Sequence, residues 1–207
     1  MSTRIAPTTI GTRKQPRQAR SRATVEAIVT AAARVLAEQG WADFTTNKVA
    51  DAAGVSIGSL YQYFPDKLAL VDAIRRRHFD DVLAIVRRIG STPKPLEAFI
   101  EELVAGMIAV HDLDPALHGV LLDEVPAYDG SRASAAEFER EYLALYAQAV
   151  AACHVDRPGV SVEVVARVLS SAVEGVIHNC ARRGELHSGA LRGELSQLIS
   201  GYLQERG

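Results

Sequence analysis

The chain has 207 residues, of which 48% are hydrophobic and 23% charged, and this balance excludes a disordered or fibrous protein. Its net charge of −2 hides a division, because residues 1–90 carry 14 Lys and Arg against 8 Asp and Glu, whereas residues 91–207 carry 9 against 17. Only the basic part is expected to meet a polyanion, and the lack of an 18-residue apolar run or signal-peptide core argues against a membrane or secreted protein.

The first predicted segment, residues 1–20, is a flexible basic arm rich in Thr, Arg, Pro and Gln without helical periodicity. The first 25 residues contain no acid, and their basic side chains are Arg4, Arg13, Lys14, Arg17, Arg20 and Arg22. A transit peptide has a similar composition, but this segment lacks the hydrophobic face that such a peptide needs. A solvated tail without a binding role is the other alternative.

A long helix is predicted from Ser21 to Gly40, because apolar residues recur on one helical face and glycine commonly ends a helix. That face contains Val25, Ile28, Val29, Ala32 and Leu36. Trp41 and Phe44 follow the glycine, and we expect these two large side chains to seal the core of a small domain.

A tight turn at Gly54 is predicted to join two short helices, over residues 47–53 and 57–64. The candidate N-caps of these helices are Thr45 or Thr46 and Ser56. Their inward positions are Val49, Ala50 and Ala53, then Ile57, Leu60 and Phe64. Pro65 ends the second helix, since a residue before proline avoids helical geometry.

This helix-turn-helix is a candidate DNA-reading element, because the outward face of its second helix lacks acids and bulky aliphatic side chains. Gly58 permits a close approach to the major groove, and Ser59 and Gln62 are candidate contacts with base edges. The predicted contacts with phosphates are Thr46, Lys48, Ser56, Tyr61, Tyr63 and Lys67. The predicted contacts of the arm are Arg17, Arg20 and Arg22. The alternative is an ordinary pair of helices with a solvated polar face.

Residues 20–70 contain a series of short motifs: Thr45-Thr46, Val49-Ala50, Ala53-Gly54-Val55-Ser56, Gly58, Leu60-Tyr61, Tyr63-Phe64 and Lys67-Leu68. Together these motifs resemble the N-terminal signature of the tetracycline-repressor (TetR) family. The resemblance implies an all-helical, homodimeric transcriptional regulator whose third helix enters the major groove, with Tyr61, Tyr63 and Lys67 on phosphates. It also implies a C-terminal domain that binds a small molecule, and a dimer built from the last two long helices.

From residue 66 onward the sequence reads as helical throughout, with no alternating strand pattern and no repeat. Asp66 is expected to begin a connecting helix over residues 66–90, which a Gly-Ser-Thr-Pro run then breaks. We therefore predict an all-α fold of about nine helices. It comprises a three-helix helix-turn-helix domain at residues 21–65, the connecting helix, and a larger ligand-binding and dimerisation domain at residues 91–207.

The last two predicted helices have broad apolar faces. An almost wholly aliphatic stripe over residues 164–177 is wider than one neighbouring helix needs, and a second stripe lies in residues 191–203. Such faces suit a four-helix bundle between two subunits. The predicted dimer contacts are Val165, Leu169, Val173, Leu195, Leu198 and Tyr202. The alternative is that both helices belong to the core of one subunit.

A ligand pocket is predicted in the C-terminal domain, because polar or large side chains interrupt its apolar helices. The candidate residues are Phe99, Met107, His111, His118, Glu124, Tyr142, Tyr146, His178 and Asn179. His178 stands out among them, since it follows an aliphatic run and a buried imidazole needs a hydrogen-bond partner.

Two groups of reactive side chains are interpreted as structural. The run His111-Asp112-Leu113-Asp114 up to His118 contains metal-ligand types, but the break at Pro115 favours a solvated loop, so neither a metal nor another cofactor is predicted. Cys153 and Cys180 are distant in sequence and lie in apolar helices, which predicts reduced thiols in a cytoplasmic protein.

The sequence thus predicts a repressor that binds a palindromic operator in double-stranded DNA as a homodimer and is released by a small lipophilic effector. An activator and a DNA-binding protein without ligand control are alternatives, and a helical enzyme is an alternative of another class. No Ser-His-Asp or Cys-His arrangement and no Gly-rich phosphate loop supports the enzyme. The predicted place of action is the bacterial cytoplasm, at the nucleoid.

Overall fold

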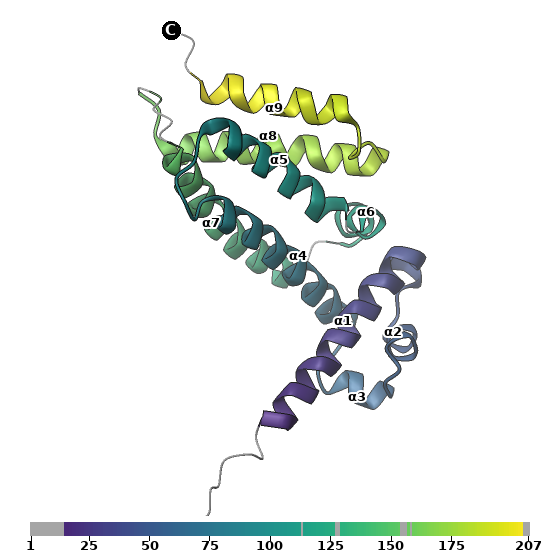
Figure 1. Ribbon diagram of the computed structural model, residues 1–207. Coiled ribbons are helices and arrows are strands. Elements are labelled where there is room, and N and C mark those ends of the chain that lie inside the picture. The colour runs from purple at the N-terminus through teal and green to yellow at the C-terminus, as the bar shows by residue number, and fades with distance from the viewer. Residues whose placement is uncertain (1–14, 113, 127–128, 154–156, 158, 205–207) are drawn as a thin grey trace, which may run out of the picture.

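The computed structural model describes residues 15–112, 114–126, 129–153, 157 and 159–204. These residues form nine α-helices and no β-strand, which confirms the predicted all-α fold (Figure 1). None of these helices has the length and apolarity that crossing a bilayer demands. Figure 1 shows α1 to α3 gathered at one end of the molecule, with α4 leading from them into the remaining helices.

The first helix, α1 (Gln15–Asp43), begins six residues before the predicted start at Ser21. Arg17 and Arg20 therefore lie on a helix and not in a flexible arm, and residues 1–14 of the predicted arm are outside the described residues. The predicted break at Gly40 is present, because this residue has φ 71° and ψ 174° inside the span of α1. A residue with a side chain rarely adopts such a positive φ, which explains why glycine stands at this position.

The helix-turn-helix forms where the local signals place it. Thr45 caps α2 (Thr46–Ala53) by accepting a hydrogen bond from the backbone N–H of Lys48, and Gly54 ends this helix in the left-handed conformation. The Ser56 side chain caps α3 (Ile57–Tyr61) by accepting from the N–H of Ser59. The prediction was wrong about Ile57, whose side chain is 37% exposed instead of buried.

Two hydrophobic cores divide the chain. The N-terminal core contains fully buried residues from the first four helices and from the link between α1 and α2: Ile28, Ala32, Leu36, Phe44, Val49, Leu60, Leu70 and Val71. It also contains Val120, Leu121 and Val125 from α6 (Pro115–Asp123) and the residues after it. The observed division therefore differs from the predicted boundary, because α6 belongs to the C-terminal part in sequence but packs with the N-terminal domain.

The second core is formed by long helices of the C-terminal part. These are α4 (Lys67–Ile89), α5 (Leu96–Asp112), α7 (Asp129–Ala152), α8 (Val162–Arg183) and α9 (Gly189–Leu203). Asp66 caps α4 as predicted, by accepting from the N–H of Ala69 at 2.8 Å. Helix α4 contributes Leu70 and Ile74 to the N-terminal core and Val82 and Val86 to the second core. A displacement of α4 would therefore change the packing of both cores.

Candidate DNA-binding surface and effector cavity

The outward face of α3 and its C-cap Gln62 combines small and polar groups with Ile57 and Tyr61, which are 37% and 50% exposed. Gly58 and Gln62 are exposed, and a Cβ atom at Gly58 would meet no heavy atom closer than the Ser56 hydroxyl at 4.0 Å. Ser59 is half-buried, and its hydroxyl shares a 2.9 Å hydrogen bond with the hydroxyl of Ser56. Gln62 thus offers the least restrained polar side chain for a base edge, whereas Ser56 and Ser59 already serve the helix cap.

Two tyrosines flank this face, and their hydroxyls are held by other helices. The Tyr61 side chain is 50% exposed, and its hydroxyl shares a 3.1 Å hydrogen bond with the Thr46 hydroxyl at the start of α2. The hydroxyl of Tyr63 accepts a hydrogen bond from Ser21 of α1 at 3.2 Å. These bonds fix both rings at the surface, in an orientation that a phosphate can meet without further ordering.

The two predicted lysines are also anchored. Lys48 is exposed and donates from its ammonium group to the backbone carbonyl of Asp43 at 2.9 Å. The Lys67 ammonium group lies 3.8 Å from the centroid of the Trp41 ring, which is a cation–π contact. Arg20 and Arg22 are exposed on α1, and the side chain of Arg17 is outside the described part. The ammonium groups of both lysines are thereby held by residues at the end of α1.

The predicted dimer contacts divide between the surface and the core. Leu198 of α9 is 48% exposed and Tyr202 is half-buried, so both remain available to a partner. The side chains of the other four residues lie inside the core of this subunit and cannot contact a second one: Val165, Leu169, Val173 and Leu195. The outer face of α8 instead presents Val164 and Val168, which are 47% and 46% exposed. The burial of these four residues does not fit their predicted role, and the outer face of α8 stays a candidate for pairing.

A cavity of about 440 Å³ lies among α4, α5, α6, α7 and α8. Its apolar lining consists of Phe79, Val82, Met107, Leu121, Val125, Ala135 and Phe138. Its polar lining consists of Arg75, His78, His111, His118, Glu174 and His178. An apolar cavity with a few convergent polar groups is the usual form of a small-molecule site.

The cavity includes some of the predicted ligand contacts and not others. Met107, His111, His118 and His178 are on its wall. The rings of Phe99, Tyr142 and Tyr146 are packed in the second core and are absent from the described lining. Asn179 is exposed and donates to the Gly175 carbonyl of its own helix, so it faces away from the cavity wall. Glu124 lies at α1, as described below.

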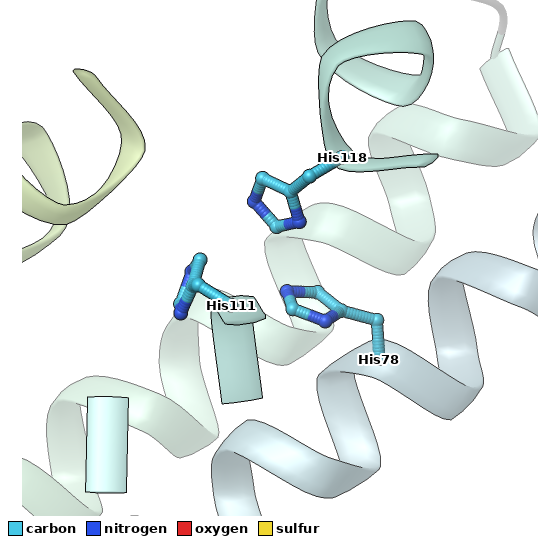
Figure 2. A group of neighbouring side chains, drawn as sticks. All are labelled: His78, His111 and His118. Carbon is cyan, nitrogen blue, oxygen red and sulfur yellow. The ribbon is translucent and has the colours of Figure 1, made fainter. Parts of the chain in front are cut away.

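Four imidazoles from four helices meet at this cavity. His78 is on α4, His111 at the end of α5, His118 on α6 and His178 on α8. Figure 2 shows the first three rings turned toward one another. Their centroids are 4.6 to 5.3 Å apart, and the Nε2 atoms of His111 and His178 are 3.1 Å apart. We refer to these four residues as the histidine cluster.

Burial keeps the histidine cluster uncharged. Desolvation, followed by the charge of neighbouring imidazoles, lowers the pKa of His78 to about 4 and that of His118 to about 2. The pKa of His178 is lowered to about 4 for the same reasons, and burial also lowers the pKa of His111. Glu174, on the same cavity wall, has a pKa raised by burial. At neutral pH the four rings are therefore neutral and each retains a nitrogen lone pair.

Helix α6 links the cavity to the N-terminal domain. Its carbonyl at Leu121 accepts from the Arg75 guanidinium of α4 at 3.2 Å, and Asp123 pairs with Arg182 of α8 at 2.5 Å. Just after α6, the Glu124 carboxylate accepts from the backbone N–H of Trp41 at 2.9 Å. Any shift of α6 caused by an occupant of the cavity would therefore act directly on α1.

A Glu124→Ala substitution is expected to destabilise the N-terminal domain by about 0.5–1.5 kcal/mol, because the Trp41 N–H loses its acceptor. Trp41 is the chain's single tryptophan, so urea unfolding followed by its fluorescence measures this domain directly. Glu101→Ala is a matched control, since Glu101 is an exposed acid on α5 away from this contact. Equal unfolding midpoints for the two variants would contradict a role of Glu124 in holding α6 to α1.

Three functional features escaped the sequence analysis. His78 was not selected, since it follows three arginines in a polar stretch and its neighbours come from distant helices. The exposed pair Val164 and Val168 could not be told from the buried residues beside them, because α8 carries aliphatic side chains on both faces. The position of α6 had no local signal, since its apolar residues fit either core equally well.

Comparison with known proteins gives two family matches that together span most of the chain. Residues 28–74 match the model described as "Bacterial regulatory proteins, tetR family". Residues 95–203 match the model described as "Tetracyclin repressor-like, C-terminal domain", and this second match alone covers more than half of the chain.

Curated relatives match over shorter segments. The HTH-type transcriptional repressor KstR2 of Rhodococcus jostii is 35% identical over 94 residues, which are 45% of this chain and 46% of that protein. The HTH-type transcriptional activator FasR of Mycolicibacterium smegmatis is 38% identical over 61 residues, 30% of this chain and 28% of that protein. The matches thus span less than half the length of these relatives.

Solved structures share the fold over nearly the whole chain. The fatty acid degradation regulator FadR from Bacillus halodurans has a TM-score of 0.71 at 21% identity, and covers 87% of this chain and 100% of its own. FadR from Bacillus subtilis, solved in complex with stearoyl-CoA, has a TM-score of 0.71 at 15% identity over 87% and 98% of the two chains. At these identities the likeness establishes the common fold.

Proposed function

The chain belongs to the TetR family of bacterial transcriptional regulators, and we propose that it is a repressor controlled by a small molecule. In this proposal two copies pair through α8 and α9 and place two α3 helices on a palindromic operator. A lipophilic effector in the 440 Å³ cavity then releases the DNA. The protein would act in the cytoplasm, on the DNA of the nucleoid.

The observation that best supports DNA binding is the exposed face of α3, which has no acidic residue and is flanked by side chains held in place by other residues. Gln62 is exposed for a base edge, while Tyr61 and Lys67 are held by Thr46 and Trp41 at the rim. Ordered rim contacts position the helix, and base contacts give specificity. Because α3 has only five residues, two half-sites are needed for useful specificity, which supports a dimer.

Control by an effector is supported by the route from the cavity to α1. The cavity wall includes Leu121 of α6 and Arg75 of α4, and both helices also contribute to the N-terminal core. An effector that prefers one position of α6 would change the spacing of the two α3 helices. The coupling is reciprocal, so operator DNA would weaken effector binding by the same factor. The relatives named KstR2 favour repression, and FasR keeps activation as the second candidate.

The experiment that tests the proposal is a footprint on DNA flanking the protein's own coding region, with two variants of α3. The wild-type chain is expected to protect a palindrome. Tyr61→Phe should weaken binding to every sequence by roughly tenfold or less, since one phosphate hydrogen bond is removed. Gln62→Ala should change the preference at single base pairs, by about 1–3 kcal/mol for each bidentate hydrogen-bond pair that the amide makes with a base. A footprint without sequence preference would contradict the proposal and favour an architectural DNA-binding protein.

A further inference from the structure

We propose that the histidine cluster is a binding site for a divalent transition-metal ion, best matched by zinc. His78, His111 and His118 provide three ligands, and His178 provides the fourth. The site does not depend on the proposed repressor function, because its four imidazoles are all part of the cavity lining.

The spacing of the nitrogen atoms is close to what a metal requires. One ring nitrogen from each of His78, His111 and His118 lies within 4.8 Å of the others, and His111 Nε2 is 3.1 Å from His178 Nε2. Four nitrogens placed 2.0–2.1 Å from a tetrahedral zinc ion stand about 3.3 Å apart. The His111–His178 pair already has nearly this separation, and the other two rings need to turn inward by an ångström or so. Each ring is on a different helix, so an ion at this position would connect four helices.

Two of the imidazoles have a nitrogen that is free to accept a metal ion, those of His111 and His118. His111 donates from Nδ1 to the Met107 carbonyl at 2.8 Å, which fixes its tautomer and leaves the lone pair on Nε2. Metal-bound histidines are commonly oriented by such a carbonyl. His118 Nε2 is buried, and no described residue gives it a hydrogen-bond partner. A buried nitrogen of this kind calls for a partner, and a metal ion is one that suits it.

The donor chemistry distinguishes this site from the one that the sequence suggested. Asp112 pairs with His187 at 3.0 Å, and Asp114 caps α6 by accepting from the Leu117 N–H at 2.9 Å. The carboxylates of the His-Asp run are thus used elsewhere, and the site contains only imidazoles. Neutral imidazoles suit zinc, nickel, copper and iron rather than magnesium or calcium. Because His111 Nδ1 donates to the Met107 carbonyl, the proton between the two Nε2 atoms belongs to His178. Binding of the ion by His178 Nε2 therefore requires His178 to carry its proton on Nδ1 instead.

The position of the site gives it a structural role. His78 and His118 line the effector cavity and also a second hollow of about 590 Å³ between α1 and helices α4 and α6. An ion bound here would connect α4, α5, α6 and α8 at the wall that separates the two spaces. It would thereby hold α6, which contacts α1, in one position, and would offer an effector a coordinating centre.

The test uses the full chain without an affinity tag, freed of metal by a chelator and dialysed. Titration with Zn²⁺ is expected to show a single ion retained per chain after gel filtration. Titration with Co²⁺ is expected to give the strong visible absorption of four-coordinate cobalt. His118→Gln should weaken zinc binding by more than about 100-fold, the upper range for outer-shell changes. His187→Gln is the matched control, because His187 is exposed, contacts Asp112 and lies outside the cluster.

The site would be overturned if the wild-type chain retained no zinc, or if the wild-type chain and His118→Gln had equal zinc affinity. Helical content measured by circular dichroism establishes that the variant is folded. If His118→Gln does not fold, His78→Gln provides the same comparison at a ring that is only half-buried. Changes in thermal stability without any difference in zinc binding would also overturn it, since the rings would then serve only packing.

Discussion

A Val168→Glu substitution is expected to convert the dimer into a monomer. Operator affinity should fall by about 10²- to 10⁴-fold, which is the gain in affinity when two half-sites are bound by linked modules. Val164, Val168 and Leu198 are nearly half exposed on the outer faces of α8 and α9. A second copy that covers this face would bury the introduced carboxylate. An unpaired buried charge costs several kcal/mol, which is comparable with the total stability of many dimers.

The measurements for this prediction are sedimentation velocity at micromolar concentration and titration of a DNA fragment that carries both half-sites. Val160→Glu is a suitable control, because it places the same charge on an exposed valine that precedes α8. Retention of the dimer mass and of operator affinity by Val168→Glu would show that the subunits pair elsewhere. A wild-type chain that sediments as a monomer would reject the dimer itself.

Leu60→Ala is the second substitution with a large expected effect. Helix α3 has five residues, and Leu60 is the one among them that is fully buried, at 0% exposure. Truncation of a buried leucine side chain costs about 2–5 kcal/mol, because apolar surface is no longer buried and a cavity remains. A helix this short has little stability of its own, so the reading surface should unfold together with its anchor.

This variant should no longer bind DNA while the C-terminal part remains folded, since Leu60 belongs to the N-terminal core alone. Urea unfolding followed by Trp41 fluorescence would show a much earlier transition, whereas circular dichroism would retain a large helical signal until higher urea. Ile57→Ala is the matched control, an apolar truncation on the same helix at an exposed side chain. If both variants unfold at the same urea concentration, Leu60 does not anchor α3.

The helix-turn-helix was predictable because its signals are local. Thr45, Gly54, Ser56 and Asp66 each act within a few residues of their position, and the structure shows all four as caps or helix ends. Helical periodicity then identified Leu60 and Phe64 as buried. The same reasoning failed at Ile57, because a five-residue helix does not bury every apolar residue that its pattern contains.

The cavity and the exposed outer face of α8 were less accessible to sequence reasoning. On α8, Val164 is exposed and Val165 is buried, a difference of one position within an aliphatic run that periodicity alone does not resolve. The histidine cluster combines four rings that come together only when their helices pack. His111 and His178 were selected for their apolar surroundings, whereas His78 is reached only through the tertiary fold.

The packing of α6 determines where this protein can be divided. A chimaera that joins the N-terminal domain of one relative to the C-terminal part of another would ordinarily be designed with its junction in or beside α4, where the first domain ends in sequence. In such a chimaera Val120, Leu121 and Val125 would come from one protein, and the rest of the N-terminal core in which they pack would come from the other. It would also separate Glu124 from the Trp41 amide that it accepts from. A chimaeric biosensor built from this protein should therefore take α6 from the same protein as the N-terminal domain, although the two are separated in sequence.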